Sequence, residues 1–431
     1  MSAATHLDPS LPEFDVVVFD EASQVPVGDA LGAIIRGRCT IVVGDSKQMP
    51  PTRFFTSKAS TDEDESADAT VTPQESILNG FIAAGFQQVM LQWHYRSRDE
   101  RLIAFSNAMF YQGNLETFPS IYPSKSRARS GVEFRFINGV YERGTTRTNQ
   151  MEAAAVVAEL ADCLKRNGNK STDRSLGVVA FSGQQRDIIQ ELWDECVDND
   201  AELRAIIGTL PEPILIKNLE SVQGDERSTM LFSIGYGPDA EGKLHMVFGP
   251  LNSSGGERRL NVAITRARDR MVIFSSIRAS DIDQSKTSAT GVRLLKQFLD
   301  YAENDAIFAS GTSGISSTHA GTPDHIEEQL AQSLRDRGLS VEMHIGRGKY
   351  RVSVAIRNPR NPERWIMGVE FDGLFWSSGL TASDREIVRL NVLKGLGWEN
   401  MRRVWCSDWI KNPKQITDEI VKAVHEAAAV D

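Results

Sequence analysis

Two carboxylates stand side by side directly after a short apolar run near the start of this 431-residue chain. Residues 16–19 read Val-Val-Val-Phe, and Asp20 and Glu21 follow them. The apolar run predicts a strand, which would place both acidic side chains at its carboxyl end. Carboxylate oxygens in that position suit a magnesium ion that also binds nucleotide phosphates. Taken alone, the same pair is equally typical of a helix N-cap.

A second apolar run repeats this arrangement twenty residues later. Residues 40–43 read Thr-Ile-Val-Val, and the polar residues Gly44, Asp45 and Gln48 come next, before two prolines at 50–51. The pattern predicts a second buried strand that opens into a loop stiffened by the prolines. Polar side chains from two neighbouring strand ends would then be available to one ligand.

Three further strings follow in the chain, at residues 91–97, 220–226 and 259–268. They contain Arg96 and Arg266, whose planar guanidinium groups fit phosphoryl oxygens. In order, the five strings resemble motifs II to VI of superfamily-one helicases, in the bacterial-type subgroup that writes DEAS and GDxxQLPP. A helix cap or a solvated helix face could explain any one string, but not five in this order.

The resemblance implies ATP and Mg²⁺ as cofactors and assigns a role to each motif residue. The aspartate of motif II helps hold the magnesium, and the glutamate polarises the water that attacks the γ-phosphate. The glutamine of motif III senses the γ-phosphate, and two arginines act as arginine fingers. The catalytic residues are thus expected to be Asp20, Glu21, Gln48, Arg96 and Arg266, and the nucleotide-binding residues Gly44, Asp45, Gln223, Gly224 and Glu226.

The first helicase motif is missing from these 431 residues, which contain no G-x-x-x-x-G-K-[ST] phosphate loop. We therefore expect the chain to be the C-terminal portion of a helicase, with an N-terminal helicase portion carrying the loop as its partner. Alone, it should hydrolyse ATP negligibly. The rival interpretation is a nucleic-acid-binding or scaffold subunit without catalysis of its own.

The last quarter of the chain resembles restriction-endonuclease-like domains related to very-short-patch-repair endonucleases. The resemblance rests on residues 368–373, 381–385 and 396–409. It implies a metal held by Glu370 and Asp372, with Glu327 or Glu328 able to approach from a helix. Two positions depart from the family, because Ser353 replaces an aspartate and Ser377 replaces a histidine. A DNA-binding, degenerate nuclease is therefore expected, with an active magnesium-dependent endonuclease as the alternative.

The predicted fold class is α/β, with RecA-like doubly wound parallel sheets followed by a small α+β domain. The first RecA-like domain is expected to be incomplete and the second complete. The expected domains are 1–74 with an acidic loop, 75–303, a linker at 304–321, and 322–431. Strands are predicted at 176–181, 230–233, 271–275, 341–345, 350–356, 365–371 and 402–406, and helices at 99–110, 151–165, 184–197, 260–266, 323–337, 382–396 and 414–428.

Charge, apolar runs and cysteine content indicate which partners the chain binds and in which cellular compartment it works. The formal charge is −10, and residues 322–431 are neutral with 16 basic and 16 acidic residues, so nucleic acid must bind in local grooves. DNA is expected rather than RNA. No apolar run approaches the ~20 residues that span a bilayer, and no secretory signal is recognised, so no membrane partner and a cytoplasmic location are expected. The four scattered cysteines fit reduced thiols.

Overall fold

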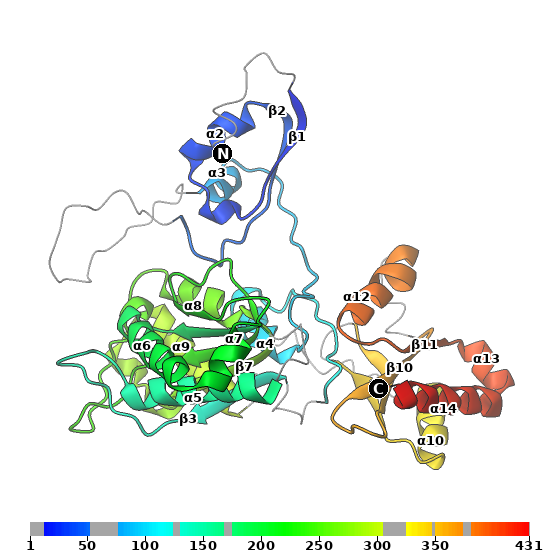
Figure 1. Cartoon of the computed structure of the whole chain (residues 1–431). Helices are drawn as coiled ribbons and strands as arrows, with labels where there is room; N and C mark the ends of the chain where they lie inside the picture. The colour runs from blue at the N-terminus through cyan, green and yellow to red at the C-terminus, as the bar shows by residue number, and fades with distance from the viewer. Residues whose placement is uncertain are drawn as a thin grey trace.

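The computed structural model describes residues 13–51, 76–123, 130–167, 175–304, 325–346, 350–373 and 381–430. The acidic loop, nearly all of the expected linker and Ser377 lie outside these ranges. The described chain forms an N-terminal unit, a larger central unit and a C-terminal domain, coloured blue, green and orange to red (Figure 1).

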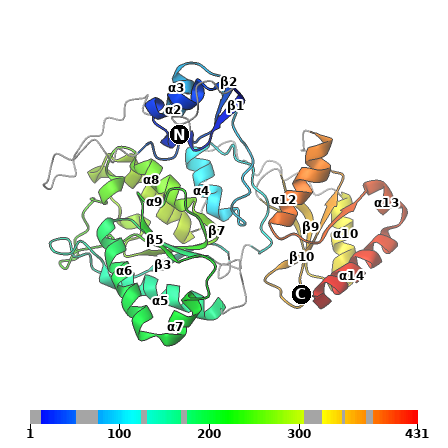
Figure 2. The same ribbon diagram turned by 45° about the horizontal axis from the view of Figure 1, so that its top comes forward.

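The N-terminal unit is built on two parallel strands, β1 (Phe14–Phe19) and β2 (Gly37–Val42). The 3-10 turn η1 (Ala22–Gln24) and helices α2 (Val27–Ile34) and α3 (Ile77–Ala83) complete it. Helix α3 contributes Ile77 to the same small core as Phe19. Helix α3 follows the boundary expected after residue 74, yet it packs with the N-terminal unit (Figure 2).

The two N-terminal strands are not buried, contrary to the prediction. On β1, Phe14, Val16 and Val18 are 50%, 48% and 59% exposed. Alternate residues of a strand point to opposite faces, and α2 and α3 cover only the face that carries Phe19. A parallel sheet is normally covered on both faces, so this unit presents an open apolar face.

The central unit contains a five-stranded, wholly parallel sheet in the order β3-β7-β6-β4-β5, as predicted for a complete RecA-like domain. Two of its strands, β3 and β5, were not predicted from the sequence. The strands are β3 (Gly131–Phe136), β4 (Leu176–Ala180), β5 (Leu215–Asn218), β6 (Arg227–Ser233) and β7 (Ala267–Ser275).

Helices cover both faces of this sheet. One face packs on α5 (Gln150–Asn167), α6 (Gly183–Asn199) and α7 (Ala201–Ile207), and the other on α4 (Arg101–Phe110), α8 (Gly256–Ile264) and α9 (Thr290–Asn304). Helix α6 begins where it does because the hydroxyl of Ser182 accepts a hydrogen bond from the amide of Gln185. The result is a three-layer α/β/α unit.

The C-terminal domain is a four-stranded mixed sheet in the order β11-β10-β9-β8, as the α+β prediction requires. Its strands are β8 (Val341–Ile345), β9 (Val352–Arg357), β10 (Trp365–Phe371) and β11 (Met401–Val404). One face packs on helices α10 (His325–Asp336), α13 (Cys406–Lys411) and α14 (Pro413–Val430). Helix α12 (Arg389–Gly395), which continues a π-helical turn at Asp384–Val388, lies on the other face.

Candidate functional site

The acidic pair lies at the end of β1, as predicted. Glu21 adopts a left-handed conformation with φ 50° and ψ 37°, which is rare for a residue with a side chain. Its amide donates to the Asp20 carboxylate at 2.9 Å, and its own carboxylate accepts from Gln24 at 3.2 Å. Both acidic residues are exposed. Strained backbone of this kind concentrates at functional sites.

The loop after β2 approaches the acidic turn closely. A Cβ on Gly44 would lie 3.0 Å from the amide nitrogen of Ser23, so the position needs glycine. The next residue, Asp45, accepts hydrogen bonds from the Lys47 amide at 2.8 Å and the Gln48 side chain at 3.1 Å. The two predicted loops therefore form one surface.

This loop is bound directly to the central unit. The hydroxyl of Tyr111, which follows α4, donates to Asp45 at 2.6 Å. The side-chain amide of Asn261 on α8 donates to the Lys47 carbonyl and to the Tyr111 hydroxyl, both at 3.0 Å. Sequence reasoning gave no role to Tyr111 or Asn261. Asn261 lies within the quoted motif VI string, whereas nothing in the sequence marks Tyr111.

Both expected arginine fingers lie at this junction. Arg266 follows α8, is only 4% exposed, and donates to the Val262 carbonyl at 2.7 Å. Burial first, and then the charge of Arg96, lower its pKa to about 10, while the charge of Glu21 acts in the opposite direction. The guanidinium therefore stays charged at neutral pH. Arg96 pairs with Glu226 at 2.8 Å.

Several buried polar atoms of the motif segments have no hydrogen-bond partner among the described residues. They include the side-chain oxygens of Ser23, Gln48 and Asn261 and the side-chain nitrogen of Gln223. Unsatisfied buried polar atoms are costly, so their presence on these motif segments fits a polar ligand that satisfies them. Gly224, next to Gln223, has φ 88° and so needs glycine.

The nucleotide fits this site only in part. The described residues hold no cluster of three or more metal-ligating side chains. Magnesium typically uses one or two carboxylates together with substrate phosphates, so Asp20 beside a nucleotide is a sufficient protein ligand. No glycine-rich loop in this sequence cradles the phosphates.

A cavity of about 500 Å³ opens at the carboxyl ends of β4, β5 and β6. The chain leaves β4 toward β5 and leaves β6 toward β7, in opposite directions, so the cavity lies at a topological switch point. Its lining includes Ser182 and Gly183 at the start of α6, Asn218 at the end of β5, and the exposed side chains of Arg143 and Arg147. The lining combines helix amides and two arginines with the carboxylates of Glu220 and Asp239.

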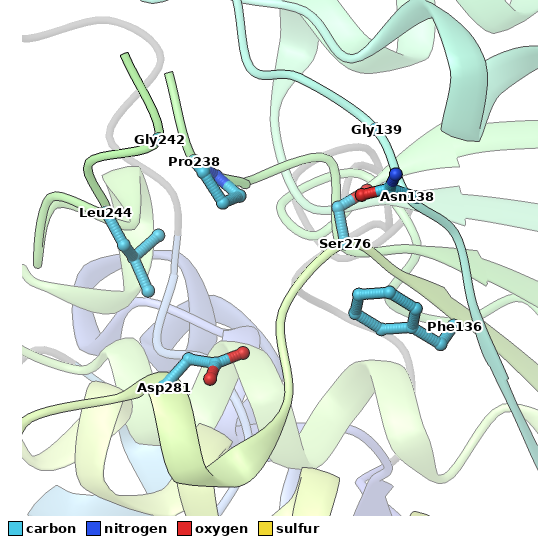
Figure 3. Close-up of a pocket in the computed structure, with 8 residues that line it drawn as sticks. All are labelled: Phe136, Asn138, Gly139, Pro238, Gly242, Leu244, Ser276 and Asp281. Carbon is cyan, nitrogen blue, oxygen red and sulfur yellow. The ribbon is translucent and has the colours of Figure 1, made fainter. Parts of the chain in front are cut away.

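A smaller cavity of about 340 Å³ lies beside the ends of β3 and β7 (Figure 3). Its one carboxylate, Asp281, already accepts a hydrogen bond from the Arg278 amide. The Ser276 hydroxyl in its wall donates to Glu152 at 3.2 Å. Glu152 is fully buried and also accepts from the Gly235 amide. Burial raises the pKa of Glu152 to about 7 against these hydrogen bonds. Nothing in the sequence marked this residue.

The C-terminal domain does not bring its two expected metal ligands together around an open position. The carboxylate of Glu370, 2% exposed, pairs with Arg389 at 2.8 Å and lies 3.8 Å from Arg403. Burial raises the pKa of Glu370 against these two charges. Asp372 instead accepts the Cys406 amide at 2.7 Å. The metal role of this pair stays a prediction.

The other residues named for this domain are buried or form ion pairs. Ser353 lies on β9 and is 2% exposed. Glu327 on α10 is 4% exposed and pairs with His344 at 2.7 Å. Glu328, on the same helix, pairs instead with Arg335.

No helix among the described residues is long and apolar enough to cross a membrane.

Comparisons with known families match two parts of the chain. The AAA domain family (AAA_12) matches residues 73–278. The REase_MTES_1575 family matches residues 326–424. The first match includes α3 and the central unit as far as β7, and the second covers most of the C-terminal domain.

Curated relatives are named as helicases. An uncharacterized ATP-dependent helicase of Mycoplasma pneumoniae is 30% identical over 94% of this chain and 36% of its own length. Its Mycoplasma genitalium counterpart is 30% identical over 99% of this chain and 38% of its own length. The chain thus spans little more than a third of either relative. Helicase SEN1 of Saccharomyces cerevisiae is 24% identical over 62% of this chain and 11% of its length.

Among solved structures, the PRRSV helicase matches 66% of this chain and 38% of its own chain at 12% identity. The TM-score is 0.27, which is too low to bear on the fold.

Proposed function

Because this chain carries a helicase-type AAA domain joined to a REase_MTES_1575 domain, we propose that it is the motor portion of an ATP-dependent DNA helicase. One observation carries the proposal. The loops with Glu21 and Asp45 meet Arg96, Arg266 and Glu226 at the junction of two α/β units. ATP would bind at that junction, so its hydrolysis would change how the units sit on each other.

The residues would divide the chemistry as follows. Glu21 would orient and polarise the attacking water, and Asp20 would share a magnesium ion with the phosphates. Arg96 and Arg266 would neutralise the charge that spreads over the transferred phosphoryl group. The unsatisfied amide of Gln48 would bond the γ-phosphate or the water. Gly44, Asp45, Gln223, Gly224 and Glu226 would shape the nucleotide side of the junction.

Hydrolysis also needs a phosphate loop, which we propose comes from an additional α/β segment. Two observations support this partner. The outer face of β1 is open and apolar, and the connector between the units exposes Val89 and Leu91 by 80% and 76%. Exposed apolar residues of this extent mark a surface that another segment covers. A strand and helix bearing the loop would cover both surfaces and supply amides for the phosphates.

The nucleic-acid strand would cross the cavity at the ends of β4, β5 and β6. The first amides of α6 are free of helix partners, and Arg143 and Arg147 add two charges. Phosphate oxygens suit both kinds of donor. The C-terminal domain would add DNA contacts without cleavage, because Ser353 cannot supply an anionic metal ligand. Within that domain Arg402 already forms an ion pair with Glu419.

ATP turnover with single-stranded DNA tests the proposal. The protein with its phosphate-loop segment should hydrolyse ATP faster when DNA is added, and these 431 residues alone should not hydrolyse it. Glu21→Gln should abolish turnover and leave ATP binding intact. Asp15→Asn, a change of an exposed carboxylate on the same strand, is the matched control. Turnover that survives Glu21→Gln would remove Glu21 from the chemistry.

The DNA path has its own test. Arg143→Ala with Arg147→Ala should weaken DNA binding and reduce the slope of log affinity against log salt by about two, one for each lost phosphate contact. An unchanged salt slope places the strand elsewhere.

A further inference from the structure

The C-terminal domain shares a hydrophobic core with the central unit. Phe118 and Ile121, which follow α4, are buried in one cluster with the C-terminal residues Tyr350, Trp365 and Trp398. The Phe118 and Tyr350 rings stack with centroids 4.8 Å apart and planes 9° apart. Figures 1 and 2 both show the strands of the C-terminal domain beside the cyan segment of the chain. The C-terminal domain is therefore not an independent unit on a tether.

Directional bonds fix this contact. The indole nitrogen of Trp398 donates to the Pro119 carbonyl at 2.8 Å, and the Trp365 amide donates to the Ile121 carbonyl at 2.9 Å. A Cβ on Gly397, where φ is 100°, would lie 2.9 Å from the Ile121 side chain. The contact thus has one geometry, set by backbone and aromatic groups together.

Trp93 joins this contact from the helicase side. Its ring meets Phe118 and Tyr350 edge-on, with centroids 5.4 Å and 5.2 Å away. The backbone beside it is also held, because the His94 amide donates to the Glu116 carbonyl at 2.9 Å and the Glu116 amide donates to the Gln92 carbonyl at 2.7 Å. Residues 92–94 are therefore fixed to the segment after α4 that contains Glu116 and Phe118.

The following residues are fixed to the central unit. The His94 ring lies 2.9 Å from the Ser97 hydroxyl, and the Arg98 amide donates to the Arg268 carbonyl at 2.7 Å. Burial first, and then the charge of Arg96, lower the pKa of His94 to about 4, so the ring is neutral at physiological pH. Arg96 lies between these two anchors and pairs with Glu226.

We propose that Trp93 is a positioning residue through which the docked C-terminal domain holds Arg96 at the nucleotide junction. This rests on the proposed function, because it takes Arg96 to act on ATP. Tyr350 of the C-terminal domain and Phe118 hold the Trp93 ring, and Arg96 follows three residues later in the chain. Loosening the clamp would release one of the two anchors of Arg96 without touching the guanidinium.

Two variants test this in the protein that contains the phosphate-loop segment. Trp93→Ala removes the ring, and Trp398→Phe keeps an aromatic ring at that position but removes the bond to Pro119. Trp405→Phe, on a side chain 42% exposed outside the shared core, is the control. Amide hydrogen exchange of residues 92–98 measures the anchoring, and steady-state ATP turnover measures the consequence.

Trp93→Ala should raise exchange at 92–98 and lower kcat by roughly tenfold or more, with a change in KM for ATP of less than about threefold, since the substituted ring packs against Phe118 and Tyr350. Trp398→Phe should act in the same direction by less, and the control should act on neither. Unchanged exchange in both variants, or raised exchange with normal kcat, overturns the proposal. A parent protein without ATP turnover refutes the proposed function instead, and exchange alone then decides whether Trp93 anchors the segment.

Discussion

Tyr111 and Asp45 are joined by a 2.6 Å hydrogen bond across 66 residues of sequence. The phenol donates, and burial together with the Asp45 charge raises the pKa of Tyr111. Asp45 belongs to the loop after β2, whereas Tyr111 follows α4 of the central unit. This bond therefore spans the junction at which a nucleotide would sit, and its strength depends on how the two units are placed.

Tyr111→Phe should reduce ATP turnover by the intact protein by roughly tenfold or more, because a hydrogen bond to a charged group contributes about 1.5–3 kcal/mol. Steady-state kinetics with single-stranded DNA present provides the measurement. Tyr301→Phe is the matched control, since it removes a buried 2.6 Å hydroxyl bond to the Arg101 carbonyl away from the junction. Equal effects of the two changes on turnover would make the Tyr111 bond purely structural.

Arg266→Ala should lower kcat by roughly 10³-fold or more, because an arginine finger stabilises charge that develops mainly in the transition state. ATP affinity, measured by equilibrium binding, should change much less. Arg293→Ala, an exposed arginine on α9, should change neither quantity. A loss confined to affinity would instead show that Arg266 binds the ground-state phosphates.

Glu152→Gln should change how stability depends on pH. The pKa of Glu152 is raised from 4.5 to about 7, so its contribution is fully present below pH 4.5 and is lost as pH rises through 7. The loss is on the order of 3 kcal/mol. Glutamine keeps the shape and never ionises. We compare the melting temperatures of variant and parent at each pH. The difference, variant minus parent, should be larger at pH 8 than at pH 5.

Two other carboxylates, those of Glu159 and Glu191, serve as comparisons in that experiment. Burial opposes the ionisation of Glu159, but its hydrogen bond and attraction to Arg135 outweigh this and hold its pKa at about 2. The contribution of Glu159 to the stability of the fold is lost as pH falls through 2, which is outside the range from pH 5 to pH 8. Glu191→Gln, on the exposed face of α6, is the control. If Glu152→Gln leaves the difference between pH 5 and pH 8 unchanged, Glu152 does not ionise in this range.

The intact chain should not nick supercoiled plasmid DNA with Mg²⁺ or Mn²⁺. The hydroxyl of Ser353 has no anionic charge, and the Glu370 carboxylate is already paired with Arg389. Ser353→Asp, checked for folding by circular dichroism, tests whether one carboxylate restores the site. Nicking by the unaltered chain that Glu370→Gln removes would contradict this, and would show that Glu370 and Asp372 hold the metal.

The domain expected at residues 322–431 does not contain the whole of its own hydrophobic core. Without Phe118 and Ile121, a fragment starting at 322 exposes Trp365 and Trp398, which are each 2% exposed in the chain. We expect such a fragment to aggregate or to bind a hydrophobic dye, unlike the whole chain. Nothing within residues 322–431 indicates that part of their core comes from 200 residues upstream.

The sequence by itself determined the elements whose signals are local. The apolar runs before Asp20 and Gly44 predicted β1 and β2, and the ordered motif strings predicted the helicase resemblance, because strand ends and motif spacing depend on neighbouring residues. Only the tertiary structure decided which contacts form between residues that are far apart in the sequence. It joined Tyr111 to Asp45, buried Glu152 at the ends of β6 and β7, paired Glu370 with Arg389, and placed Trp93 against the C-terminal domain. It also showed that β1 is half exposed, because burial depends on which segments cover a sheet and an apolar run cannot specify them.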